Sequence, residues 1–169
     1  MKRIIFILTL VISLSGCYSF KGASIPTEMK TINISLFENN APLVIPTLSN
    51  NFTESLKTYI RNQSKLTITP QQEADASITG RITGYDIKPI SIQDNTRPVA
   101  GANRLTITVS VKYTNNIKDH EKESFEESFT AFTDFTLAGQ SLQSIQERLI
   151  KEVNIKLTEN IFNRAFAQW

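Results

Sequence analysis

The sequence is poor in the side chains that most often perform catalysis. Its 169 residues include one cysteine, Cys17, and one histidine, His120. A histidine that acts as a general base needs a positioned acid and a nucleophile, and no such set is apparent around the charged turn that holds His120. A metal site would need further histidine or cysteine ligands. We therefore expect His120 to be a solvated loop residue and the protein not to be an enzyme.

Two other catalytic patterns are missing. Glu126 and Glu127 are adjacent, so on a strand they point to opposite faces and cannot act as a pair. No glycine-rich loop of the kind that cradles phosphate groups is present. We expect no metal and no dissociable cofactor.

An excess of charge of either sign is also absent. The chain carries 18 lysines and arginines against 16 aspartates and glutamates. Without Lys2 and Arg3, which lie in a signal peptide as argued next, basic and acidic residues number 16 each. A neutral chain has no global field that would attract nucleic acid. Contact with an anionic partner would have to come from a local basic patch.

The chain lacks a hydrophobic run long enough to span a membrane. The uncharged stretch from Ile4 to Leu14 follows Lys2 and Arg3, and its length is typical of a signal peptide, whereas a spanning helix needs roughly 20 apolar residues. The run ends in Leu14-Ser15-Gly16-Cys17, which resembles the lipobox of bacterial lipoproteins. We predict a signal peptide over residues 1–16.

Cys17 is then the new first residue, and it is predicted to carry a diacylglycerol group and an acyl chain. A plain secretory signal with an incidental cysteine is the alternative. A lone cysteine in an exported chain has no internal disulfide partner, so lipidation explains its position better. Two or more acyl chains give stable membrane attachment. Residues 17–30 are predicted to be a lipidated tether, because Gly22, Ser24 and Pro26 discourage regular structure.

The rest of the chain, residues 31–169, is predicted to form one domain. Apolar residues alternate with polar ones in several stretches, which indicates strands with one buried face. These predicted strands are 31–37, 66–69, 76–82, 104–113 and 124–135. The alternation changes phase at Gly84, which predicts a bulge there, and Pro89 indicates an edge position or a second irregularity. Residues 93–103 are predicted to be a loop.

Two segments show the three- and four-residue spacing of an amphipathic helix. The first begins near Thr47, a possible N-cap, and ends near Asn62. The second begins at Ser141 or one turn later at Ser144, which with Glu147 fits a capping box. Its apolar stripe consists of Leu142, Ile145, Leu149, Val153 and Leu157.

The order of elements, β-α-β-β-β-β-α, predicts an α+β fold. We expect a two-layer sandwich in which both helices pack on one face of a mixed sheet of four to five strands. The first strand–helix–strand unit should be a right-handed crossover, and the later strands an antiparallel meander. The other face of the sheet carries Thr, Ser, Lys and Arg, so it should be either solvated or covered by something polar.

Several segments together resemble the LptE family of lipopolysaccharide-assembly lipoproteins. They are Gly16–Pro26, Leu36–Asn39, Ile78–Tyr85, Arg104–Val111 and Phe162–Trp169. The resemblance covers essentially the whole chain after Cys17. It implies a lipid-anchored protein of the outer membrane whose domain faces the periplasm or the lumen of the LptD β-barrel. It further implies that the domain plugs that barrel, helps it to assemble and assists lipopolysaccharide transport. A polar sheet face suits the polar interior of a large barrel.

Lipopolysaccharide carries phosphates and acidic sugars, which basic side chains bind well. The candidate contacts lie on the predicted central strands and the loop between them: Arg81, Lys88, Arg97, Arg104 and Lys112. The alternative is that these are ordinary solvated residues. A different function also fits the same features, namely a lipid-anchored binding module or pilot protein of another envelope or secretion machine.

Overall fold

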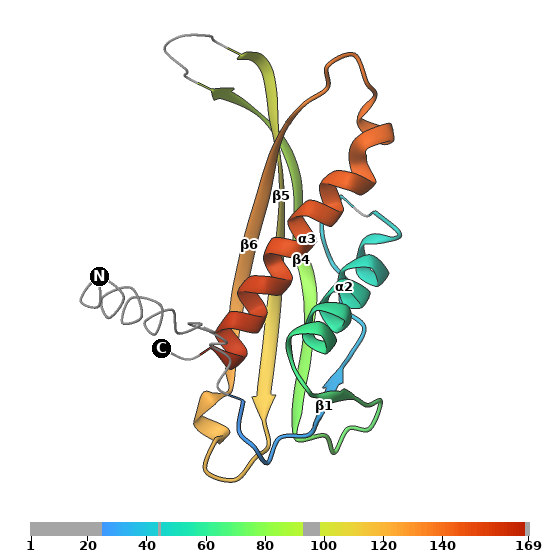
Figure 1. The fold of residues 1–169 in the computed structure, drawn as a ribbon. Coiled ribbons are helices and arrows are strands. Elements are labelled where there is room, and N and C mark those ends of the chain that lie inside the picture. The colour runs from blue at the N-terminus through green and yellow to red at the C-terminus, as the bar shows by residue number, and fades with distance from the viewer. Residues whose placement is uncertain (1–24, 44, 93–98, 168–169) are drawn as a thin grey trace, which may run out of the picture.

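The computed structural model describes residues 25–43, 45–92 and 99–167. The predicted signal peptide, Cys17, most of the tether and Arg97 lie outside this part of the chain. The described residues form one mixed sheet with two helices, shown in Figure 1. The strands are β1 (Thr31–Ile34), β2 (Glu38–Asn39), β3 (Thr67–Ile68), β4 (Ala76–Ile92), β5 (Val99–Asn115) and β6 (Phe125–Thr136), and the helices are α2 (Leu48–Gln63), η1 (Glu121–Glu123, 3-10) and α3 (Leu142–Phe166).

The sheet order confirms the predicted α+β sandwich. The strands lie in the order β3-β1-β4-β5-β6, and β2 extends the line of β1 along β4. The pairs β1–β3 and β1–β4 are parallel, while β4–β5 and β5–β6 are antiparallel. Both α2 and α3 cover one face of this sheet, and α3 runs along β5 and β6 (Figure 1). The sheet has six strands rather than four or five because the first predicted strand is divided.

That division corrects the prediction of one strand over residues 31–37. The pairs Ile34↔Ile78 and Glu38↔Arg81 place four steps on one strand against three on the other, so one extra residue bulges out. Leu36 is consequently 61% exposed, whereas Phe37 is fully buried. The alternation of Ile32, Ile34 and Leu36 gave the wrong inward residue, because a one-residue slip exchanges the two faces of a strand.

Phe37 is held inside by contacts with β4 and α2. Its ring lies across Gly80 of β4 and packs edge-on against Phe52 of α2, with ring centroids 4.8 Å apart. Its backbone N–H donates to the hydroxyl of Thr53 at 3.1 Å, and its carbonyl accepts from the hydroxyl of Ser49. Gly80 leaves the space that this ring fills, so the bulge fixes α2 onto the sheet.

The predicted bulge at Gly84 is confirmed. Ile82 pairs with Val109 and Gly84 with Thr108, so Thr83 is the extra residue. The bulge turns Tyr85 into the core. A second irregularity lies between Ile90 and Ile92, just after Pro89, which agrees with the expectation for that proline.

The predicted loop over residues 93–103 is too long. Strand β5 begins at Val99, which pairs with Ile92. Strands β4 and β5 are therefore 17 residues each, which corresponds to a hairpin roughly 55 Å long. Pro98, Gly101 and the polar residues around them favour a loop in isolation, but pairing with β4 satisfies the backbone of residues 99–103.

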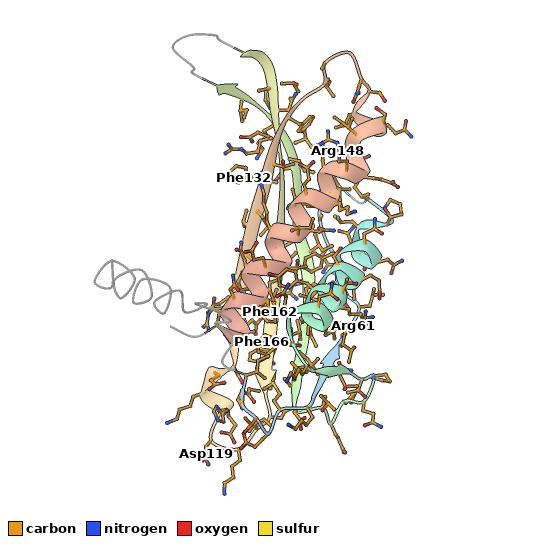
Figure 2. All side chains as sticks on the ribbon, viewed as in Figure 1. Arg61, Asp119, Phe132, Arg148, Phe162 and Phe166 are labelled. Carbon is orange, nitrogen blue, oxygen red and sulfur yellow. The ribbon has the colours of Figure 1, made fainter. Side chains whose placement is uncertain are left out.

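The helices bury the faces that their spacing predicts. Ser141 is the N-cap of α3, since its hydroxyl accepts from the N–H of Ser144 at 3.2 Å. This places the start of α3 at Leu142 rather than one turn later. Thr47 occupies the N-cap position of α2, but its side chain makes no capping hydrogen bond. In α3 the stripe is buried from Ile145 through Phe166, and Figure 2 labels Phe162 and Phe166 near its C-terminal end.

Candidate functional site

The face of the sheet opposite the helices is polar. Strand pairing aligns short hydroxyl side chains across three strands, as in the rows Arg81–Ser110–Ser128 and Gly84–Thr108–Thr130. The hydroxyls of Thr108 and Thr130 lie 3.1 Å apart and share a hydrogen bond. The polar face is formed by Thr79, Arg81, Thr83, Asp86, Lys88, Arg104, Thr106, Thr108, Ser110, Lys112, Glu126, Ser128, Thr130, Phe132 and Asp134. These side chains are exposed or half-buried, so the face is available to a partner.

Arg104 is engaged on this face by its neighbours on β6. Its guanidinium donates to both carboxylate oxygens of Asp134, at 2.7 and 2.9 Å, and stacks over the ring of Phe132 at 3.8 Å from the centroid. The hydrogen bond from Arg104 lowers the pKa of Asp134 and raises that of Arg104 itself. The charge of Arg104 is therefore largely compensated within the sheet.

Lys88 lies directly opposite Arg104 in the β4–β5 ladder. Its ammonium group is 3.9 Å from the carboxylate of Asp86, and both side chains are exposed. An exposed ion pair of this kind contributes little to stability, so the side chain of Lys88 remains available.

Arg81 and Lys112 form a second group. They lie on adjacent strands, two residues apart in register, around a shallow hollow of about 280 Å³ that Gly80 also lines. Glu38 and Glu126 stand at its edge. Within the described part of the chain, neither Arg81 nor Lys112 forms an ion pair or a side-chain hydrogen bond.

The structure thus divides the predicted basic residues. Arg81 and Lys112 lie together, Lys88 and Arg104 lie further along the hairpin, and Arg97 is outside the described residues. Sequence reasoning missed the carboxylate of Asp134 as the partner of Arg104, because that contact depends on the register between β5 and β6. It did place Phe132 off the buried face, which is correct.

His120 lies at the other end of the molecule, in the loop beside Asp119 that leads into η1 (Figure 2). Its Nδ1 is 2.6 Å from a carboxylate oxygen of Glu123, and Glu123 also accepts from the amide of Asn115 at 2.9 Å. The described residues contain no cluster of three or more histidine, cysteine, aspartate or glutamate side chains that would hold a metal ion.

The His120–Glu123 pair predicts a pH dependence of stability. The hydrogen bond to Glu123 raises the pKa of His120 above its ordinary value of 6.5. The stabilisation is therefore fully present below the unfolded pKa and lost as pH rises through the folded one. Between about pH 5.5 and about pH 8.5, a range that spans the histidine transition, the melting temperature of the wild type should fall more than that of His120→Gln. Equal falls in thermal unfolding scans would contradict the pairing.

Comparison with known proteins identifies the family. The family model described as "LptE: Lipopolysaccharide-assembly" matches residues 29–165. The chain belongs to the LptE family. The match includes both helices, every described strand and the polar face. No curated protein matches the chain in sequence.

Solved structures share the fold of this LptE-family chain. Rare lipoprotein B from Shewanella oneidensis is 11% identical, with a TM-score of 0.51 over 79% of this chain and 92% of that one. A hypothetical protein from Chlamydia trachomatis is 14% identical, with a TM-score of 0.52 over 80% of this chain and 94% of that one. In the part of the chain that the structure describes, neither helix is long and apolar enough to cross a membrane.

Proposed function

We propose that this LptE-family protein is an outer-membrane lipoprotein, anchored through Cys17, that seats inside an LptD-like β-barrel, helps it to assemble and assists lipopolysaccharide transport. Membership of a lipopolysaccharide-assembly family supports the general role. The observation that carries the finer proposal is the uncovered polar face of β4, β5 and β6, which extends over a 17-residue hairpin.

This polar face has the chemistry that a barrel lumen requires. Porin-type lumens are polar and hydrated, so a plug needs many neutral hydrogen-bonding groups rather than an apolar patch. Thr106, Thr108 and Thr130 supply such groups, and Asp134 neutralises Arg104. A face of this kind keeps the domain soluble before assembly and still offers hydrogen bonds to the barrel wall.

Co-purification tests the barrel partner directly. The full-length lipoprotein, tagged at its C-terminus and extracted from its own cells in mild detergent, is expected to bring down a large LptD-like β-barrel in stoichiometric amount. An untagged strain serves as the control. Extracts that yield no such barrel would refute the plug role, and recovery of a secretion channel instead would favour a pilot protein.

Lipopolysaccharide binding is expected to depend most on Arg81 and Lys112. A hydrogen bond to a charged group contributes about 1.5–3 kcal/mol, so reversing both charges to glutamate should weaken binding of the lipid-free domain by about tenfold or more. The matched control reverses Arg61 and Lys65, two exposed cations at the end of α2, and should leave affinity unchanged. Equal affinities by surface plasmon resonance would remove this pair as the contact.

A further inference from the structure

A groove of about 840 Å³ lies between α2 and α3. On α2 it extends from Asn51 to Asn62, which corresponds to about 17 Å of helix. On α3 its floor follows Ile150, Asn154 and Thr158, at the four-residue spacing of one helix face, and all three are buried. The groove belongs to the helix layer and is separate from the polar face of the sheet.

Asn154 is the unusual residue of this floor. Its side chain is 1% exposed, and neither its amide nitrogen nor its carbonyl oxygen has a hydrogen-bond partner. The hydroxyl of Thr158 donates to the carbonyl of Ile155 instead. Unpaired polar groups in a protein interior are uncommon, and each one costs stability. An aliphatic residue would pack here without that cost, so the site retains a donor and an acceptor for which the fold supplies no match.

The missing partner must offer one acceptor and one donor side by side. A carboxamide presents both, and the main-chain peptide groups of an extended segment present the complementary pair. The charges around the groove cancel, with Glu54 and Glu147 against Arg148 and Lys151. Two of the four are already paired, Glu54 with Lys57 at 2.9 Å and Arg148 with Glu152 at 2.6 Å. A neutral ligand fits this groove better than a phosphate group.

The rim of the groove also carries an apolar side chain. Ile155 is 50% exposed and lines the groove next to Asn154. An extended peptide that binds Asn154 through its main chain would cover Ile155 with one of its own side chains. Extended residues rise by about 3.3 Å each, so the groove has room for about five of them.

We propose that this groove binds an extended polypeptide segment of the barrel partner, one of whose peptide groups pairs with the side chain of Asn154. This inference rests on the function proposed above. The strands of a barrel wall already pair their main-chain groups with each other, so the segment that binds here is a loop or an irregular stretch. Asn154 is then a receptor for main chain, while the polar face meets the barrel wall.

A site-specific cross-link tests the proposal in the intact complex. The photoreactive amino acid p-benzoylphenylalanine replaces Ile155 in the full-length lipoprotein, and the complex is purified through a tag on the barrel. Irradiation is expected to join Ile155's position to a loop of the barrel polypeptide. The further substitution Asn154→Leu should lower the adduct yield by about tenfold, since two hydrogen bonds are lost. Asn160→Leu, the same change at an exposed position outside the groove, should leave the yield unchanged.

The outcomes separate this proposal from the function on which it rests. Absence of the barrel from the purified complex overturns the plug role. Recovery of the barrel with no adduct, or with an adduct on a glycan, overturns the groove proposal alone. An adduct that Asn154→Leu does not reduce also overturns it, because a buried water would then suffice for the amide. The leucine variant should melt at or above the wild-type temperature, which shows that a lost adduct is not a folding defect.

Discussion

Replacing Gly80 with alanine is expected to destabilise the domain by about 3 kcal/mol, near the upper end of the usual cost of overpacking. A Cβ at this position would lie within 3.0 Å of both the Ser110 carbonyl oxygen and the ring of Phe37. The carbonyl belongs to the β4–β5 ladder and cannot move without breaking it. The ring of Phe37 is fully buried against Phe52, so it has no space into which to retreat. The midpoint of urea unfolding measures the loss.

Gly84, in the same strand, provides the matched control for Gly80. Its Cβ would meet the Cβ of Thr108 at 3.3 Å, with no backbone atom closer than 3.9 Å. Thr108 is half-buried on the polar face, so a small shift relieves the contact. Glycine inside a strand is itself unfavourable by roughly 0.5–1 kcal/mol relative to alanine, which offsets the remaining strain. Gly84→Ala should change stability by less than about 1 kcal/mol, and a loss equal to that of Gly80→Ala would contradict the structural reason.

The substitution Cys17→Ser is expected to abolish membrane attachment altogether. The hydroxyl of serine does not accept the diacylglycerol group in place of the thiol, so both the thioether-linked lipid and the acyl chain that follows it are lost. Each buried methylene contributes about 0.8 kcal/mol to membrane binding, and removal of every chain leaves no anchor. The protein should move from the membrane pellet to the soluble fraction after cell lysis and centrifugation.

A neighbouring substitution distinguishes lipidation from an ordinary secretory signal. Ser19→Ala lies two residues beyond Cys17 and should leave the protein in the membrane pellet. Radiolabelled palmitate should be incorporated by the wild type and by Ser19→Ala but not by Cys17→Ser. If all three proteins fractionate alike and none takes up label, then Cys17 is an incidental cysteine.

The sequence predicts those elements in which one face is buried throughout. The stripe of α3 and the alternation of β5 gave both elements correctly, because their packing partners run alongside them for many residues. The phase change at Gly84 also showed in the sequence, since the bulge has long apolar flanks on both sides. These patterns report burial directly, so they needed no knowledge of distant partners.

The errors occur where a distant strand decides the outcome. Leu36 continues the apolar alternation, but Gly80 creates the space that draws Phe37 inward, and no local pattern reports that glycine. The start of β5 at Val99 depends in the same way on pairing with Ile92. The pairing of Arg104 with Asp134 depends on the β5–β6 register, and the unpaired amide of Asn154 depends on the packing of two helices. Function-bearing contacts were therefore less predictable than the fold.

The strand order has a consequence for the sequence of folding events. Strands β4, β5 and β6 are joined by successive hairpins, so their contacts are local and can form early. Strand β1 pairs with β4 across some 44 residues, as the register Ile32↔Ala76 shows, and it also needs α2 and β3 in place. The segment that emerges first from the ribosome is thus among the last to acquire its structure. An exported chain benefits from this delay, because its leading part stays free of stable structure until the strand that holds it has followed.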